Sequence, residues 1–178
     1  NDKLVVPEIQ RDYVWGANKS NPDIVSNFVL DLNEKAKNKN NENFQLGFLY
    51  SYGHGGELHL IDGQQRMTTL VLLAFFCACK EKKEGVETQN IMDMVGHFSY
   101  RARIDTENFM HSLFSHEDEF VKDLSLFSAS KLKDNTWFRA KYNQDTTIVS
   151  MVRSLNTIYE LSRSLGSGFC LTFTWIIE

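Results

Sequence analysis

A polar segment between two apolar stretches holds most of the residues that could do chemistry. Residues 60–69 read LIDGQQRMTT, and an apolar helix-like run follows directly. A helix that begins right after a strand presents free N–H groups and a partial positive charge, and both favour an anion such as phosphate. Arg66 would add a forked donor to phosphate oxygens, and the hydroxyls of Thr68 and Thr69 would add further donors.

The two glutamines of this segment predict binding and orientation instead of proton transfer. A side-chain amide does not exchange protons near neutral pH, so Gln64 and Gln65 could hold a water molecule but not act as a base. Gly63 makes the turn between the strand and the helix. The central candidate site is therefore Asp62, Gly63, Gln64, Gln65 and Arg66, and its candidate catalytic residues are Asp62, Gln64, Gln65 and Arg66.

Asp62 admits three interpretations. With Asp62 as the N-cap and Gln65 at the third helical position, the segment is a variant of the capping box, typically worth about 1 kcal/mol relative to alanine. That interpretation leaves Gln64, Arg66 and the two threonines without a role. A carboxylate repels phosphate unless it binds a cation, so Asp62 could instead hold Mg²⁺, which bridges carboxylates and phosphates. It could also be the base that activates water. The sequence leaves these alternatives open.

A second polar cluster lies near the start of the chain, where residues 6–16 read VPEIQRDYVWG. In the functional interpretation Gln10 and Arg11 face a nucleotide, Arg11 meets phosphate, and Tyr13 or Trp15 stacks on the base. In the structural interpretation the aromatic side chains belong to an edge or lid, and Arg11 is a surface charge. The residue types alone favour neither interpretation.

The first half of the chain alternates strand-like and helical patterns. Residues 3–6 are extended, and residues 21–37 predict an amphipathic helix. Residues 44–53 and 57–62 predict two strands joined by the glycine-rich turn GHGG, which indicates a hairpin. The helix from Gln64 to about Lys83 is apolar on every side in its middle, so we expect it to be buried.

The second half is mainly helical. Residues 87–164 predict helices with breaks near Gly96, Ser115 and Asn135, and the best-patterned helix, residues 147–165, ends at Gly166. Residues 169–178 predict a strand that returns from far along the chain. We therefore expect an α+β fold of one domain, with a small mixed β-sheet core. Its parts are a strand-rich region with a central buried helix (1–84), a helical region (85–165) and the returning strand (166–178).

Composition excludes several classes of protein. The chain has 178 residues, 42% of them hydrophobic, which is enough for one sizeable core. Its net charge of −4 argues against broad non-specific DNA binding. The longest apolar run, 70–79, is shorter than the roughly 20 residues that cross a bilayer, and no signal segment opens the chain. The three cysteines have no metal-ligand spacing and suit a reducing cytoplasm. Because the chain opens without Met and stops after a strand-like run, we expect a fragment of a longer protein.

Two weaker candidates are better explained structurally, and the common phosphate loops are absent. His54 and His59 flank the glycine turn, but nothing supplies the other ligands of a zinc site. The segment NTWFRAKY (135–142) could contact nucleic acid, although aromatic side chains that pack inward are favoured. Neither GxxxxGK[ST] nor GxGxxG occurs, so a nucleotide site must be built from a helix start and arginines brought from elsewhere.

The two motifs, in this order and spacing, closely resemble the bacterial domain-of-unknown-function-262 family. That family includes the N-terminal domain of the GmrSD modification-dependent restriction enzymes and related anti-phage proteins. The segment YRARIDTENF (100–109) resembles a third family block with a Tyr-x-x-Arg pattern. The resemblance covers almost the whole chain, and DGQQR with its Thr-Thr-Leu continuation is its most specific part. It implies a ParB/sulfiredoxin-like core with inserted helices.

The resemblance implies a nucleoside triphosphate-binding and hydrolysing domain, with Mg²⁺, in a bacterial cytoplasmic defence protein. The DGQQR residues, 62–66, would form the central site, Gln10 and Arg11 would face it, and Arg103 would be a third contributor. Expected partners are nucleotide, DNA through the full-length protein, and a downstream nuclease or effector domain. The alternative is a non-catalytic sensor of nucleotide or modified DNA that controls such an effector. A ParB-like nuclease is disfavoured by the acidic balance, so this chain alone is not expected to cleave DNA.

Overall fold

Four short strands form one mixed sheet in the computed structural model, which describes residues 3–17, 23–37 and 46–169. β1 (Lys3–Val6) lies between β3 (Glu57–Asp62) and β4 (Phe98–Tyr100) and runs parallel to both. β2 (Tyr50–His54) pairs antiparallel with β3 at the edge of the sheet, so the spatial order is β2-β3-β1-β4. The predicted α+β class with a small mixed sheet is confirmed. The ParB-like relationship stays a prediction.

The hairpin of β2 and β3 is confirmed, but its first strand is shorter than predicted. β2 begins at Tyr50, and residues 46–49 before it have no regular structure. The turn needs glycine, because Gly55 and Gly56 have φ angles of 59° and 80°, a backbone region that other residues rarely adopt. The early part of the expected strand is instead held by the side chain of Arg66, as described below.

β4 is a strand that the prediction of a mainly helical region over residues 85–165 did not include. Its three residues are all buried and lie against β1, with Leu4 opposite Phe98 and Val6 opposite Tyr100. A strand of three residues is too short to show an alternating pattern, and only the neighbouring β1 makes it a strand. The sequence therefore could not reveal it.

The helices follow the predicted pattern closely. They are α1 (Ile24–Lys37), α2 (Gln64–Lys83), α3 (Gln89–Gly96), α4 (Ile104–Ser115), α5 (Glu117–Lys122), α6 (Ala129–Lys133) and α7 (Thr146–Leu165). Short 3₁₀ turns η1 (Leu124–Phe127), η2 (Ala140–Gln144) and η3 (Gly166–Gly168) connect or follow them. The predicted breaks near Gly96 and Ser115 coincide with the ends of α3 and α4. α7 begins with a side-chain cap, because Asp145 accepts a hydrogen bond from the N–H of Ile148 at 3.0 Å.

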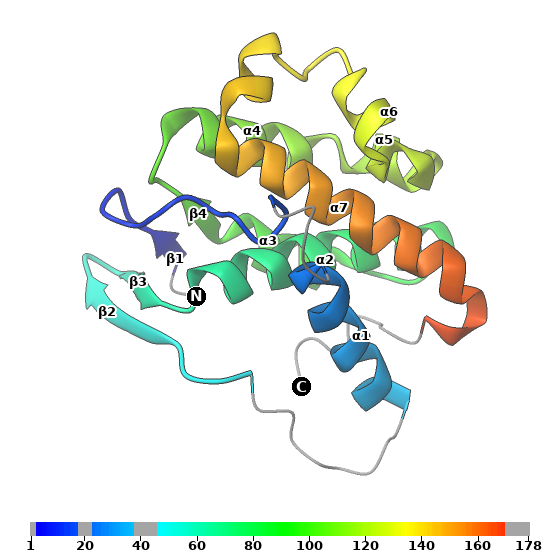
Figure 1. Ribbon diagram of the computed structural model, residues 1–178, viewed down its shortest axis with the longest axis horizontal. Coiled ribbons are helices and arrows are strands. Elements are labelled where there is room, and N and C mark those ends of the chain that lie inside the picture. The colour runs from blue at the N-terminus through cyan, green and yellow to red at the C-terminus, as the bar shows by residue number, and fades with distance from the viewer. Residues whose placement is uncertain (1–2, 18–22, 38–45, 170–178) are drawn as a thin grey trace.

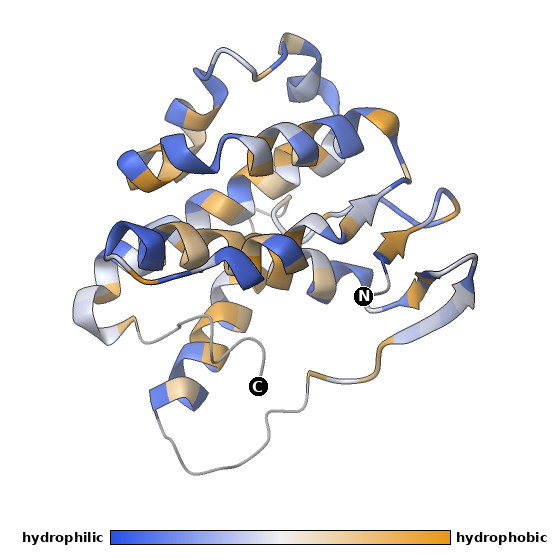
Figure 2. Cartoon of the chain, turned by 180° about the vertical axis from the view of Figure 1, so that it is seen from behind, coloured by the Kyte–Doolittle hydropathy of each residue, from blue (hydrophilic) through white to orange (hydrophobic). Residues whose placement is uncertain are grey.

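α2 is the central element of the core. It packs against α3, α5 and α7, and every residue from Val71 to Cys79 is buried. Figure 1 shows α2 running through the middle of the molecule, with its beginning beside the strands, and Figure 2 colours the same chain by residue hydropathy. Since all its sides are covered, its apolar middle agrees with the sequence prediction.

Aromatic side chains fill the space between α2 and the helices of the second half. Phe75 of α2 contacts Phe114, Phe120 and Phe127, with ring centroids 5.2–5.7 Å apart. In the segment 135–142, Trp137, Phe138 and Tyr142 all contact the ring of Phe109. The inward packing of NTWFRAKY is thus confirmed.

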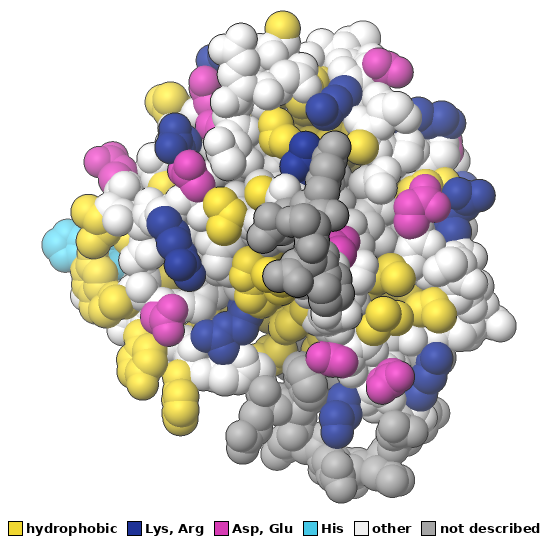
Figure 3. Space-filling model, viewed as in Figure 1, with side chains coloured by type: hydrophobic (Ala, Val, Ile, Leu, Met, Phe, Trp, Pro, Cys, Tyr) yellow, Lys and Arg dark blue, Asp and Glu magenta, His cyan; other side chains and the backbone are white. Residues whose placement is uncertain are grey.

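Exposed apolar side chains concentrate on the hairpin and the segment before it. Phe48, Tyr50, Tyr52 and Ile61 are between 45% and 78% exposed, and Figure 3 shows hydrophobic side chains gathered on that side of the molecule. Within the described residues, no helix is long and apolar enough to cross a membrane. The predicted returning strand falls on residues 169–178, of which 170–178 lie outside the described part.

Candidate functional site

The start of α2 is shaped by Gly63. This residue is the N-cap, with φ 87° and ψ 5°, and no side chain caps the helix. Asp62 is instead the last residue of β3, is exposed, and makes no side-chain hydrogen bond or ion pair with a described residue. The capping-box interpretation is therefore wrong, because the left-handed glycine turns the chain from strand to helix one residue after Asp62. The first N–H groups of α2 have no side-chain cap, and the Asp62 carboxylate has no partner among the described residues.

Gln65 holds the loop of residues 7–17 against α2. Its Oε1 accepts a hydrogen bond from the N–H of Val14 at 2.9 Å, and its Nε2 donates to the carbonyl of Asp12 at 2.9 Å. The side chain is 5% exposed. Because both ends of this amide bond to the loop backbone, Gln65 positions the loop.

Gln64 keeps one polar atom without a partner. Its Nε2 donates to the carbonyl of Arg11 and to the hydroxyl of Tyr100, the latter at 3.2 Å. The Tyr100 hydroxyl also donates to the Arg11 carbonyl at 3.1 Å, and burial raises the pKa of this hydroxyl. The amide of Gln64 is thus fixed in one orientation. Its Oε1 is buried and has no hydrogen-bond partner among the described residues, which is uncommon for a buried polar atom.

Arg66 is directed toward the segment before β2. Its guanidinium donates to the carbonyls of Leu46 and Phe48, the second at 2.9 Å. Gly47 lies between these two residues with φ 81°, and a Cβ there would come within 2.2 Å of the guanidinium. Arg66 therefore holds residues 46–48 through one donor on each of its two terminal nitrogens.

The aromatic residues of the first motif anchor the loop. Tyr13 is fully buried, and its hydroxyl contacts the hydroxyls of Thr69 at 2.9 Å and Ser154 at 2.8 Å. Burial raises the pKa of Tyr13 to about 12. Trp15 packs edge-on against Phe28 of α1, with ring centroids 5.5 Å apart. Tyr13 is thus enclosed by protein, where a base could stack on it only after a rearrangement, whereas Trp15 is half-buried.

The other predicted polar residues divide between structural contacts and open positions. Gln10 donates to the carbonyls of Leu60 and Ile61 at 3.2 and 3.0 Å, which ties the loop to β3. Arg11 is exposed, and its guanidinium bonds to no described residue. Thr68 is fully buried, and its hydroxyl has no partner within the described part of the chain.

The third family block reaches the same loop. Arg103 donates from Nε and Nη2 to the carboxylate of Asp12 at 2.9 and 3.1 Å, and this raises the pKa of Arg103. Tyr100 of the same block bonds to the Arg11 carbonyl. Both residues of the Tyr-x-x-Arg pattern thus contact the first motif, although they lie almost ninety positions away. The exposed ion pair contributes about 0–1 kcal/mol to stability, so it mainly fixes geometry.

Sequence reasoning missed several residues that contact the loop of residues 7–17 near the start of α2. Asp12 directly follows Arg11, and Tyr100 opens the Tyr-x-x-Arg pattern that contains Arg103, so these positions were the signal that could have revealed both residues. Thr147 and Ser154 of α7 bond to Tyr13, and they had no sequence signal, because hydroxyl residues are common in helices. The described residues contain no group of three or more His, Cys, Asp or Glu that could hold a metal ion.

The structure is an α+β domain. Its three sequence motifs meet where β3 passes into the buried helix α2. The chain matches the family described as GmrSD restriction endonuclease, N-terminal domain, over residues 1–174. It belongs to that family and is therefore a restriction-system domain. Neither the curated proteins nor the solved structures contain a significant match.

Proposed function

We propose that this domain binds and hydrolyses a nucleoside triphosphate at the start of α2, within a bacterial anti-phage, modification-dependent restriction protein. One observation carries the proposal. α2 has no side-chain cap, and its first residue, Gln64, is 4% exposed and keeps an unpartnered carbonyl oxygen there. A helix start favours phosphate, and a buried acceptor without a partner indicates a missing ligand group.

The contacts assign different tasks to the arginines. Arg66 is engaged by backbone carbonyls and Arg103 by Asp12, so both position the chain around the site. Arg11 is exposed and bonds to no described residue. Arg11 is therefore the guanidinium that would neutralise phosphate charge, a contribution that dominates phosphoryl transfer.

A magnesium ion fits the residues present. Mg²⁺ on nucleotides is usually held by one or two carboxylates, with phosphates and water completing its shell. Asp62 offers one exposed carboxylate without a described partner, directly before the start of α2. Asp62 would hold the ion, which would supply positive charge next to the triphosphate when bound.

Gln64 would orient the attacking water. Its Nε2 is fixed by the Arg11 carbonyl and the Tyr100 hydroxyl, so its Oε1 can only accept a hydrogen bond. Water held there would attack the γ-phosphorus, the bond to the bridging oxygen would break, and the water proton would pass to a phosphate oxygen. Gln65, bonded at both ends, would hold the loop that carries Arg11.

Phosphate release and nucleotide binding by the wild type and by Arg11→Ala test this function. We expect Arg11→Ala to weaken triphosphate binding about tenfold or more, because it removes charge-assisted hydrogen bonds. Arg163→Ala is the matched control, since Arg163 is exposed in the last turn of α7, where it pairs with Glu160 and lies over the Tyr159 ring. Equal triphosphate binding by wild type and Arg11→Ala would refute the site.

A non-catalytic sensor is the second candidate, and the loop contacts favour it. Gln64 and Gln65 both bond to the backbone of residues 11–14, so a ligand that displaced these bonds would release the loop and could signal to a downstream nuclease or effector domain. DNA would engage the full-length protein. Stoichiometric triphosphate binding with Mg²⁺ present, but without phosphate release, would identify the sensor.

A further inference from the structure

A second pocket lies beside β4. It has a volume of about 320 Å³ and opens between α3 and α4, next to the first residue of β1. Tyr100 lines this pocket, and its hydroxyl also bonds to Gln64 of α2. The Ser99 hydroxyl bonds to Glu107 of α4. Arg11, Asp62 and Gln64 do not line the pocket, so it is a second site that meets the proposed triphosphate site only at Tyr100.

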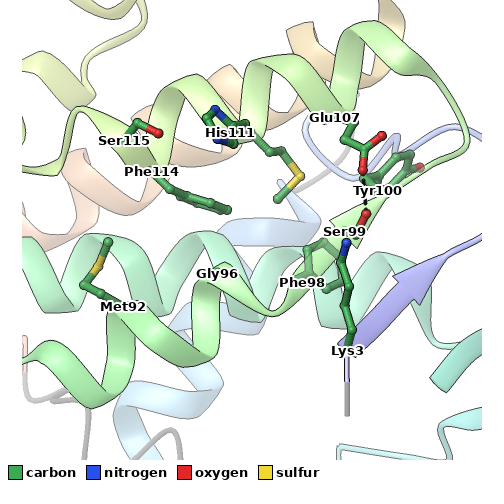
Figure 4. Close-up of a pocket in the computed structure, with 11 residues that line it drawn as sticks. Lys3, Met92, Gly96, Phe98, Ser99, Tyr100, Glu107, His111, Phe114 and Ser115 are labelled. Atoms are coloured by element: carbon green, nitrogen blue, oxygen red, sulfur yellow. Dashed lines mark hydrogen bonds between the residues drawn. The ribbon is translucent and has the colours of Figure 1, made fainter. Parts of the chain in front are cut away.

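Apolar side chains form most of the pocket walls. Phe98 and Met110 are nearly fully buried, and Met92 and Phe114 are half-buried. Figure 4 shows Phe114 and Met92 facing the space between the two helices. Phenylalanine and methionine side chains suit a flat ring, because thioethers make favourable contacts with aromatic systems. The volume lies at the small end of ligand pockets, about 300–1,000 Å³, so the ligand is of ring size.

Two opposite charges stand at one end of the pocket. Ser99 donates to Oε1 of Glu107 at 2.9 Å, which fixes the carboxylate. The other carboxylate oxygen bonds to no described residue. The amino group of Lys3 likewise has no described partner, and in Figure 4 it points toward Ser99. A fixed acceptor beside a donor complements a ligand edge that carries an N–H next to a C=O.

We propose that this pocket binds a nucleobase with such an edge, as guanine, thymine and uracil have. The N–H would donate to Glu107, the C=O would accept from Lys3, and the ring would lie between the phenylalanine and methionine side chains. The sugar would leave through the open side, where Gly96, His111 and Ser115 are exposed. Adenine and cytosine lack this edge in their neutral forms and should bind worse.

Nucleosides without phosphate test the pocket independently of the triphosphate site. Guanosine, thymidine, adenosine and cytidine would be titrated into the whole chain, with NMR shifts or calorimetry as the readout. We expect guanosine and thymidine to bind about tenfold more tightly than the other two. Arg11→Ala should leave this binding unchanged. No binding up to the solubility limit, or equal binding of all four nucleosides, would overturn the proposal.

Two variants locate the ligand within the pocket. Glu107→Gln keeps the acceptor for Ser99 but removes the charge, and we expect roughly tenfold weaker guanosine binding. Glu119→Gln, exposed on α5, is the matched control. Gly96→Leu should weaken binding while the protein stays folded, because Gly96 lines the pocket at its open side and a Cβ there meets no atom within 4 Å. Unchanged binding in both variants would place the ligand elsewhere.

The same assay distinguishes the two sources of a base. A single-stranded thymidine oligonucleotide that competes with free thymidine for the pocket would identify a base presented by DNA. Competition by free nucleosides alone would identify a small-molecule effector. An adenine oligonucleotide of equal length controls for binding through the phosphate backbone, which carries no sequence information.

Discussion

At the scale of single residues, most side chains of the DGQQR motif hold neighbouring segments of the chain in place. Gln65 and Arg66 donate hydrogen bonds to backbone carbonyls of two segments that are distant in sequence. Gln64 does the same with its nitrogen and leaves only its oxygen open. The side chains of Asp62 and Arg11 make no hydrogen bond or ion pair with the described residues. A polar motif can therefore be specific because it positions loops, and its chemistry then rests on few atoms.

Gln65→Ala should destabilise the domain by about 2 kcal/mol, because two hydrogen bonds to the loop backbone are lost and each is worth about 1 kcal/mol. Urea unfolding followed by circular dichroism measures the difference. Gln144→Ala, at an exposed position of η2, is the control and should be neutral. A Gln65→Ala protein as stable as the wild type would contradict the loop-clamping role.

Tyr13→Phe should cost about 1 kcal/mol near neutral pH, because the hydroxyl bonds to Thr69 and Ser154 are lost. Burial raises the Tyr13 pKa from 10.0 to about 12. Between these two pH values the folded state keeps the hydroxyl proton, while the unfolded state releases it. The stability that the neutral hydroxyl provides is complete below pH 10 and is lost as pH rises toward 12.

Unfolding of the two proteins at about pH 8 and about pH 11 checks this sign. The wild type should lose more stability than Tyr13→Phe over that interval, since all other tyrosines are common to both. A constant difference between the two proteins would show that Tyr13 does not titrate abnormally.

At the scale of elements, the loop of residues 7–17 is as important as any helix. Gly16 allows it to approach α7, because a Cβ there would lie 2.1 Å from the Ser150 carbonyl oxygen and 2.7 Å from the Ser154 hydroxyl. Gly16→Ala should therefore destabilise the fold by about 1–3 kcal/mol through overpacking.

Gly53→Ala is the matched control for this close approach. Gly53 has no atom within 4 Å of a built Cβ and lacks a positive φ, so its substitution should stay within about 0.5 kcal/mol of the wild type. Thermal unfolding compares both variants. Equal melting temperatures would show that the loop yields without cost.

The same scale shows what sequence patterns could predict about the elements. α2 and α7 were placed within a residue or two, because long helices repeat their apolar spacing many times. β4 was missed, because three residues carry no period. Residues 46–49 were wrongly placed in a strand, because nothing in their own sequence shows that Arg66 holds their carbonyls.

At the scale of the whole molecule, α2 joins the sheet end to the helical half. Its buried thiols Cys77 and Cys79 have raised pKa values because burial disfavours their charged form. Because the middle of α2 is buried and β2 is an exposed edge strand, amide hydrogen exchange should be slowest in the middle of α2 and much faster in β2. Uniform exchange over both elements would contradict a core centred on α2.

The sequence by itself determined the α+β class, the long helices, the buried α2 and the family, because each is written in local spacing or in a contiguous motif. Only the tertiary structure decided which polar atoms stay free for a ligand. The side chains of Gln64, Arg66 and Tyr13 form hydrogen bonds with segments that the fold brings next to them, and the side chain of Asp62 does not. Hydrogen bonds between distant segments depend on how the chain packs, and no local pattern encodes that packing.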